Sequence, residues 1–312
     1  MFAGILMLAM TGAPVAQAPS AASIKIIVPF PPGGTGDVIA RLFGQQMQTP
    51  TQSFVVENRP GASTIIATEQ VVRAVPDGTT LLEVANAFVI NPSLRSNLPF
   101  DPFTLEPVCL LANSPQVMAV NASSPYKSFA EFIAAAKAKP GELSYASVGP
   151  ATTPHITGEM FRRSAQINLN YVPFPGGAPA VNALLGNHVT AVMANLSEIM
   201  EHATAGKLRP IVTTAGARLR EMPDIPTLKE SGFDLEGSAW FGIVAPPKTP
   251  KDVIERLSAQ FTTALQASDV QSKLAAQGLY PSGLCGAQFA AHLRQQYESL
   301  GKIIREVNMK AE

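Results

Sequence analysis

Two stretches of the chain share one order of elements: a short apolar run, a loop rich in glycine, proline and threonine, and a helix with an apolar side. The first comprises the strand Ile24–Val28, the loop Pro29–Gly36 and the helix Asp37–Met47. The second comprises the strand Leu143–Ala146, the loop Ser147–Thr153 and the helix Pro154–Arg163. Because further strands and helices alternate around both units, the sequence favours mainly parallel sheets covered by helices. We therefore expect an α/β protein with two lobes.

The chain is expected to cross between these lobes twice. The polar, proline-containing segment Asn121–Pro125 follows the strand Val117–Val120 and is the expected first crossover. The strand Ser238–Ala245 ends at Pro246-Pro247 and is the expected return. The predicted division is 1–18 as a signal peptide, 19–122 as the first part of lobe 1, 123–237 as lobe 2, and 238–312 as the return and second part of lobe 1. Two crossovers predict a hinged ligand cleft between the lobes.

The first 18 residues have the pattern of a secretory signal. They carry no charged side chain, are apolar from Phe2 to Met10, and end in Ala16-Gln17-Ala18, the pattern that signal peptidase recognises. The apolar run is shorter than the roughly 20 residues that span a bilayer. No cysteine follows the cleavage position, which disfavours a lipoprotein anchor. The basic segment that usually opens a signal is missing, so we expect the true start to lie upstream and the mature protein to be periplasmic.

Composition excludes two broad classes of protein. The 312 residues include 23 Lys and Arg against 23 Asp and Glu, so no excess positive charge is available to bind nucleic acid. A hydrophobic content of 46% excludes intrinsic disorder. The two cysteines invite a disulfide in an oxidising compartment. However, Cys109 lies in an apolar stretch where a buried thiol is the commoner outcome, and Cys285 lies in a glycine-rich turn. The sequence therefore favours two separate thiols and leaves open whether a bridge forms.

The two strand-to-helix loops carry the chemistry that the sequence suggests. Neither contains lysine or arginine. Loops at the carboxyl ends of strands face the ligand crevice of an α/β sheet, and each following helix begins there with unpaired N–H groups and a partial positive charge. Gly33 and Gly34 can adopt positive φ, and Thr153 before Pro154 matches a helix cap. This pattern predicts capture of a carboxylate by backbone amides, although ordinary turns and caps would give the same residues.

Other kinds of site have weaker support. The loops lack the Gly-Lys-Ser/Thr and Gly-x-Gly-x-x-Gly patterns of nucleotide binding. The four histidines show no metal-ligand spacing, so we expect neither metal nor cofactor. His155 could act as a base but more often such a residue contacts a ligand or stabilises the fold, and no Gly-x-Ser-x-Gly motif occurs, so we expect no enzyme. Further residues could either reach the cleft or serve as caps and packing: Asn86, Asn91, Asn195, Trp240 and Phe241.

The chain resembles the Bug-type solute receptors, the periplasmic binding components of tripartite tricarboxylate transporters. The resemblance covers about residues 24–310. It is carried by the following segments: Ile27-Val28-Pro29-Phe30-Pro31-Pro32-Gly33-Gly34, Val56-Glu57-Asn58-Arg59-Pro60-Gly61-Ala62, Pro76-Asp77-Gly78-Thr79-Thr80-Leu81-Leu82, Ile90-Asn91-Pro92-Ser93-Leu94, Leu143-Ser144-Tyr145-Ala146-Ser147 and Trp240-Phe241-Gly242. It implies a type II periplasmic-binding-protein fold that closes on a small organic acid, with one carboxylate held by loop amides and ordered waters.

The resemblance also implies which residues bind the ligand. Together with the two asparagines that the strand ends suggest, the candidate residues are Phe30, Pro32, Gly33, Gly34, Thr35, Asp37, Asn86, Ser147, Gly149, Ala151, Thr152, Thr153, His155 and Asn195. The chain departs from the family at Ala194, where an aspartate is common, and at Phe174-Pro175-Gly176, where Tyr-Lys-Gly is common. Both changes remove polar groups. We therefore expect a monocarboxylate or aromatic acid rather than citrate or an acidic amino acid.

The expected function is thus hinge closure around a small organic acid and its delivery to the membrane subunits of a tripartite transporter. We expect a monomer that binds no nucleic acid. Two alternatives remain open: an α/β enzyme acting on a small acid, and a ligand sensor that docks on a signalling protein. Ligand identity and the existence of a cognate transporter are outside what the sequence determines.

Overall fold

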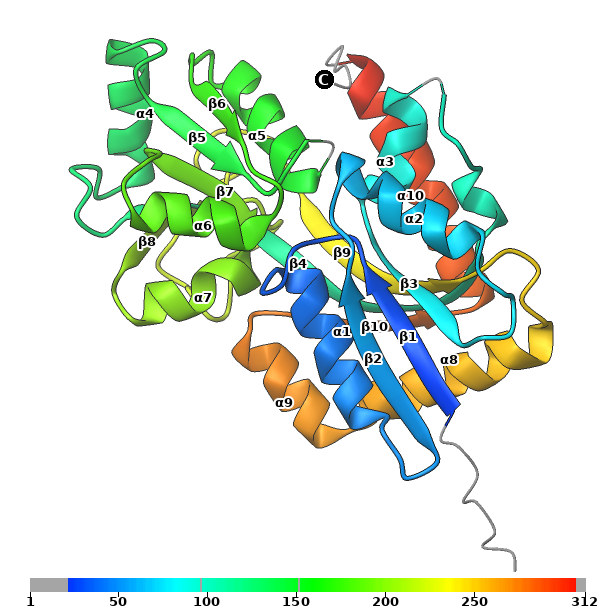
Figure 1. The fold of residues 1–312 in the computed structure, drawn as a ribbon. Coiled ribbons are helices and arrows are strands. Elements are labelled where there is room, and N and C mark those ends of the chain that lie inside the picture. Colours follow the sequence, from blue (N-terminus) through cyan, green and yellow to red (C-terminus); the bar gives the residue numbers. More distant parts are fainter. Residues whose placement is uncertain (1–21, 96, 151, 307–312) are drawn as a thin grey trace, which may run out of the picture.

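The protein consists of two α/β lobes that lie side by side (Figure 1). The computed structural model describes residues 22–95, 97–150 and 152–306. Each lobe has a central sheet with helices on both faces, so the expected two-lobed α/β architecture is confirmed. The proposed signal peptide and Ala151 lie outside the described residues. No helix in the described ranges is long and apolar enough to cross a bilayer.

Lobe 1 is built from both ends of the described chain. Its N-terminal elements are β1 (Ala22–Val28), α1 (Thr35–Gln46), β2 (Gln52–Asn58), the 3-10 turn Ala62–Thr64, α2 (Ile65–Val72), β3 (Thr80–Ala85), α3 (Ala87–Leu94) and the 3-10 turn Pro102–Thr104. Its C-terminal elements are β9 (Ser238–Ala245), α8 (Lys251–Gln266), α9 (Ser268–Ala276), β10 (Tyr280–Cys285) and α10 (Ala287–Glu306). The strands β1, β2 and β3 are parallel, and β9 runs antiparallel to β3.

Lobe 2 repeats this construction with the middle of the chain. Its elements are α4 (Phe129–Ala138), β5 (Ser144–Ser147), α5 (Thr153–Ser164), β6 (Asn170–Pro173), α6 (Gly177–Leu185), β7 (Ala191–Asn195), α7 (Leu196–Thr204) and β8 (Leu208–Thr213). The strands β5, β6 and β7 are parallel.

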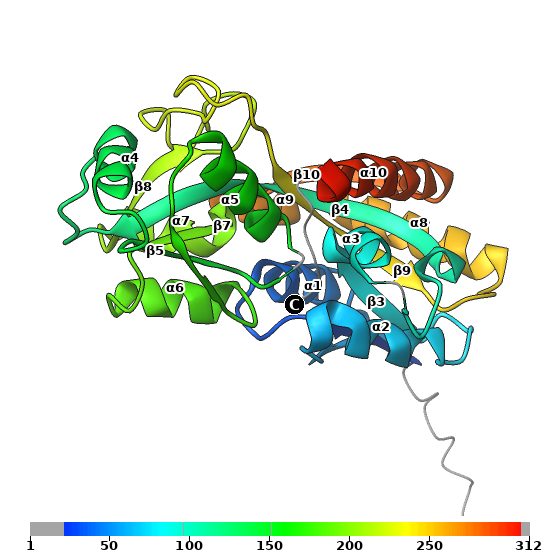
Figure 2. The ribbon, with the colours of Figure 1, turned by 90° about the horizontal axis from the view of Figure 1, so that it is seen from above.

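One long strand, β4 (Glu106–Asn121), belongs to both lobes. Figure 2 shows it running from one lobe into the other. Its residues up to Pro115 pair with β9, and those from Gln116 onward pair with β7. The sequence suggested Asn121–Pro125 as the first passage between the lobes. In the structure this passage instead occurs inside β4. Proline and polar residues mark a chain break locally, whereas the change of partner depends on distant strands. The residue ranges proposed for the lobes remain a prediction.

Apolar helix faces cover both sides of each sheet. In lobe 1, α1, α8 and α9 pack on one face through residues such as Phe43 and Phe261, and α2, α3 and α10 pack on the other through residues such as Phe289. In lobe 2, α4 and α5 cover one face, and α6 and α7 cover the other. This layering leaves the strand-to-helix loops at the edges where the two lobes meet.

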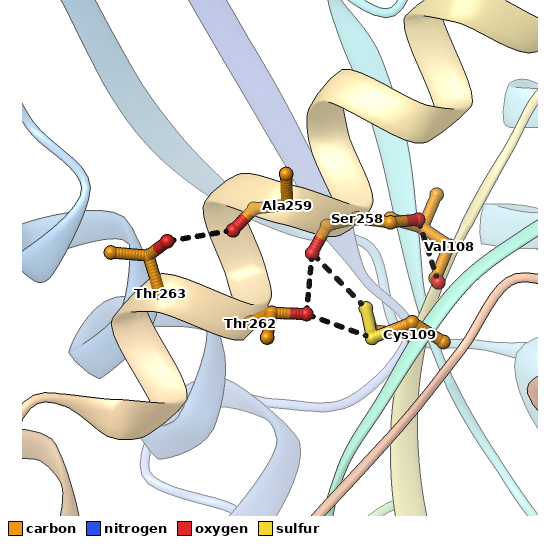
Figure 3. Close-up of a disulfide and its surroundings, with 7 residues drawn as sticks. Val108, Cys109, Ser258, Ala259, Thr262 and Thr263 are labelled. Atoms are coloured by element: carbon orange, nitrogen blue, oxygen red, sulfur yellow. Dashed lines mark hydrogen bonds between the residues drawn. A yellow bond between two sulfur atoms is a disulfide. The ribbon is translucent and has the colours of Figure 1, made fainter.

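The structure joins Cys109 and Cys285 in a disulfide, which corrects the expectation of two separate thiols. Both residues lie opposite each other in the antiparallel pair of β4 and β10, with their Cα atoms 4.0 Å apart. Figure 3 shows the bridge beside α8, where the Thr262 hydroxyl donates to the Cys285 sulfur at 3.4 Å. The sequence did not predict β10, whose Pro281 and Gly283 interrupt a strand pattern. Without that strand, nothing placed the two cysteines together.

Candidate functional site

A narrow cavity of about 30 Å³, here called the inner cavity, lies between the two lobes. This free volume corresponds to about two waters. Its lining includes seven of the candidate residues: Phe30, Gly34, Thr35, Asn86, Thr152, Thr153 and Asn195. The rest of its described lining is Gly36, Ala85, Ala87, Val148, Pro154, Gly177, Glu198, Ala239 and Phe241. No lysine or arginine is among these residues.

Five helices begin at the inner cavity. Thr35, Thr153 and Gly177 are the first residues of α1, α5 and α6, while Asn86 and Asn195 are the N-caps of α3 and α7. Each helix start carries backbone N–H groups without partners inside the helix and about half a positive charge. Helix starts from both lobes therefore make the cavity suitable for an anion although no cationic side chain lines it.

The first loop is held in place by Asp37, which itself does not line the cavity. The carboxylate of Asp37 accepts hydrogen bonds from the Gly33 N–H at 3.0 Å, Arg41 Nε at 3.0 Å and Asn58 Nδ2 at 2.8 Å. Burial alone would raise the pKa of Asp37, but these bonds and the charge of Arg41 together lower it. Gly33 has a φ of +81°, as expected, whereas Gly34 caps α1 with a φ of −77°. Asp37 thus positions the loop from which Phe30 and Gly34 line the cavity.

The second loop is closed by its own side chains. The hydroxyl of Thr152 donates to the Gly149 carbonyl at 2.6 Å, and Gly149 has a φ of +127°. The sequence suggested Thr153 as the N-cap of this helix. Helix α5 instead begins at Thr153, so its N-cap is Thr152. A proline is accepted at either of the first two helical positions, so Pro154 did not distinguish the two registers.

A larger space of about 320 Å³, here called the outer chamber, opens beside the inner cavity. The two share Phe30, Ala87, Val148 and Thr152 in their linings. The outer chamber has no charged residue among its described lining residues, which are mostly proline, glycine and aromatic or small side chains. Gly149, Phe174 and Pro175 contribute to it, so one of the two departures from the family pattern faces this space. The other departure, Ala194, is buried in β7 and lines neither space.

Five candidate residues that the structure describes lie outside both linings: Pro32, Gly33, Asp37, Ser147 and His155. The Ser147 hydroxyl lies 3.0 Å from that of Tyr171, and the ring of His155 stacks on the Tyr171 ring at 4.4 Å. Ser147, Tyr171 and His155 thus contact one another beside the second loop, outside the two spaces. Metal-binding groups of His, Cys, Asp or Glu are absent from the described part of the chain.

The aromatic pair on β9 divides between two roles. Successive strand residues point to opposite faces. Phe241 lines the inner cavity, whereas Trp240 packs edge-on against Phe289 and His292. Asn86 reaches the same strand, since its Oδ1 accepts the Trp240 N–H at 3.0 Å. Asn91 donates to the Ser63 carbonyl at 2.7 Å and lines neither space.

Glu198 is the functional candidate that sequence reasoning missed. It lies in the first turn of α7 and lines the inner cavity. One carboxylate oxygen accepts the Asn195 N–H at 3.2 Å, and the other accepts the Thr35 N–H from lobe 1 at 3.4 Å. Burial raises the pKa of Glu198, and these hydrogen bonds oppose the rise. The Asn-x-x-Glu spacing could have predicted the start of α7, but not the contact across the lobes.

Glu83 is a second buried carboxyl near the loop but outside the cavity. It lies on β3 with no exposed surface, and neither oxygen has a hydrogen-bond partner among the described residues. A Cβ at Gly36 would lie 2.8 Å from its Oε2, so the carboxyl sits directly beneath the start of α1. Burial, reinforced by the charge of Asp37, raises the pKa of Glu83 to about 8.

Comparison with known proteins agrees with this architecture. Residues 39–309 match the family described as tripartite tricarboxylate transporter family receptor. Protein BugT of Bordetella pertussis is 32% identical over 292 residues, covering 92% of this chain and 90% of its own length. A solved periplasmic transporter is 36% identical with a TM-score of 0.88, covering 92% of this chain and 98% of that one.

A further solved protein, from R. palustris with adipate, is 28% identical with a TM-score of 0.88 and covers 92% of this chain and 98% of its own. The expected periplasmic-binding-protein fold is thereby confirmed. The chain belongs to the tripartite tricarboxylate transporter receptor family, the Bug-type periplasmic solute-binding proteins.

Proposed function

We propose that this protein is a periplasmic receptor that captures a small organic acid between its lobes and delivers it to the membrane subunits of a tripartite transporter. The observation that carries the proposal is the meeting of five helix starts from both lobes at a cavity lined by no lysine or arginine among the described residues. The ligand carboxylate would accept backbone N–H groups of the first and second loops.

The binding step is a hinge closure. A ligand shifts an open–closed equilibrium only by its higher affinity for the closed form. A carboxylate that bridges N–H groups of α1 and α5 makes contacts with both lobes, and these contacts exist together only when the cleft is closed. The closed form would then signal occupancy to the membrane subunits.

The ligand that we propose is a monocarboxylate with an apolar or aromatic body. The inner cavity accommodates the acid group, and the uncharged outer chamber, with Phe30 and Phe174 in its lining, accommodates the body. We propose binding without turnover, since His155, the candidate base, stacks on Tyr171 instead of lining either space. Export by the signal in residues 1–18 and a monomeric state belong to the same proposal.

The substitution Thr153→Pro tests the role of the backbone amide. It removes one N–H at the first position of α5, where proline is accepted, and Thr152 before it already has extended backbone with ψ of 161°. Thr153→Ala is the matched control because it loses the same hydroxyl and keeps the N–H. Calorimetry with a panel of organic acids should give about tenfold weaker binding for Thr153→Pro than for Thr153→Ala. Equal affinities, or a bound acid held mainly by a basic side chain, would contradict the proposal. Dicarboxylates as the strongest ligands would contradict the proposed ligand class.

A further inference from the structure

We infer that Glu198 and Asn195 select the ligand: they favour a monocarboxylate that carries a hydrogen-bond donor on the carbon beside its carboxylate, and they disfavour a second carboxylate there. The donor is a hydroxyl or an ammonium group. This inference rests on the proposed function and adds to it the chemistry of the group next to the acid.

The first observation is a spare acceptor position in the wall of the inner cavity. Asn195 is 4% exposed and lines the cavity. Its Nδ2 donates to the Thr35 hydroxyl at 3.2 Å, and its Oδ1 faces only the backbone of Glu198, as part of the capping box that opens α7. An amide oxygen has two lone pairs, so this buried oxygen is suited to a further donor supplied by the ligand.

The second observation is the position of the Glu198 carboxylate, three residues further along α7. Its hydrogen bond to the Asn195 N–H is half of a capping box and has a structural role. Helix capping does not account for the other oxygen, which reaches across the lobes to Thr35 with a long bond of 3.4 Å. A Cβ at Gly177 would lie 2.0 Å from this oxygen, so glycine there leaves the space that the carboxyl occupies.

The Glu198 carboxyl has no cationic partner among the described residues. None of the described ion pairs includes it, and no lysine or arginine occurs in the described lining of the inner cavity. Two acceptors therefore stand beside the N–H groups that would hold the ligand carboxylate. When Glu198 is ionised, a second ligand carboxylate at this place would meet a like charge in a narrow space, whereas a donor would pair with it.

Binding of matched acids to the protein and to Glu198→Gln tests this inference. The probes are butanoate and 3-phenylpropanoate, each compared with analogues that carry hydroxyl, amino or carboxymethyl groups on carbon 2. In the unchanged protein, the analogues with a hydroxyl or amino group on carbon 2 should bind about tenfold more tightly than the parent acid. The analogue with a carboxymethyl group should bind about tenfold more weakly. In Glu198→Gln the advantage of the amino acids should largely disappear and the carboxymethyl acids should bind more tightly.

The variant Glu198→Gln keeps the size of the side chain and one oxygen that can accept the Asn195 N–H. A melting curve checks that this variant is folded. Glu201→Gln removes an exposed carboxylate on the same helix and should leave the ranking unchanged. A structure of the amino-acid complex provides a second measurement, with its nitrogen expected within hydrogen-bond distance of Glu198.

The outcomes separate this inference from the proposed function. If the acids bind but their ranking is the same in the unchanged protein and in Glu198→Gln, or if the nitrogen lies away from Glu198, this inference is overturned and carboxylate capture stands. If none of the acids binds, the proposed function is overturned and this inference with it.

Discussion

The hydroxyl of Thr35, the first residue of α1, lies 2.8 Å from the hydroxyl of Ser197 in α7. The same Thr35 hydroxyl accepts a hydrogen bond from Asn195, and the Thr35 N–H donates to Glu198. The start of one helix in lobe 1 is thus tied to the first turn of one helix in lobe 2. Under the proposed hinge motion, these bonds between the lobes would form only on closure and would add to its free energy.

We therefore expect Ser197→Ala to weaken ligand binding without weakening the fold. The substitution removes one hydroxyl pair between the lobes, worth about 1 kcal/mol or roughly fivefold in affinity. Calorimetry measures the affinity, and small-angle scattering should show a larger share of the open form. Ser272→Ala, an exposed serine inside α9, is the control. Unchanged affinity in Ser197→Ala would mean that this bond contributes nothing to closure.

Glu83 predicts a pH-dependent stability. The folded protein keeps the Glu83 proton up to a pKa of about 8, whereas the unfolded chain releases it near 4.5. The folded state therefore binds more protons between these values, and the free energy of unfolding falls as pH rises through this window. Glu83→Gln removes this loss and should raise the free energy of unfolding by about 2 to 4 kcal/mol at pH 7.5.

The stabilisation by Glu83→Gln should shrink as pH falls toward 4.5, because both states then hold the proton on Glu83. Denaturant unfolding at several pH values measures it. Glu69→Gln, at a more exposed carboxylate on α2, controls for the general loss of one acidic group. A stabilisation that is equal at pH 5 and pH 7.5 would argue against a protonated Glu83 in the folded state.

Asp37 predicts the opposite dependence. Its pKa is lowered below the usual 3.8, because the hydrogen bonds from Arg41, Gly33 and Asn58 outweigh the effect of burial. The stability it contributes is present above pH 3.8 and is lost as pH falls through its folded-state pKa. At pH 7, Asp37→Asn should lower the free energy of unfolding by about 1 to 3 kcal/mol and weaken ligand binding through a displaced first loop.

The difference between Asp37→Asn and the unchanged protein should narrow below pH 3.8, where the carboxylate takes up its proton. Thermal unfolding across this range measures it, together with ligand affinity at pH 7. Asp269→Asn, at an exposed acid of α9 that pairs with Lys273, is the comparison. If ligand binding were unaffected by Asp37→Asn, the first loop would not depend on this carboxylate.

The disulfide predicts sensitivity to reductant. The bridge joins residues 176 positions apart and restricts the unfolded chain. Replacing both cysteines by alanine should lower the free energy of unfolding by about 2 to 4 kcal/mol, and a reductant should lower the melting temperature in a similar way. Ligand selection should not change, because neither cysteine lines the inner cavity or the outer chamber. A melting temperature that is insensitive to reductant would contradict the bridge.

Several elements were predicted well because their signals are local. The glycine, proline and threonine residues of the two loops, followed by amphipathic runs, correctly indicated α1 and α5 within two residues. The strand Ser238–Ala245 agrees at both ends. By contrast, β10 with Pro281 and α3 with Pro92 contradict the usual residue preferences of their elements, and tertiary packing holds them in place.

The amino-acid order by itself determined the alternation of strands and helices, the two cation-free loops and the family to which the chain belongs. These properties depend on neighbours along the chain, and periodicity and turn residues report them directly. Only the tertiary structure decided that β4 serves both lobes, that Cys109 meets Cys285, and that Glu198 reaches Thr35 across the cleft. Each of these features brings together residues that are far apart in the chain. Whether such residues meet depends on how whole strands and helices pack, which local sequence patterns do not report.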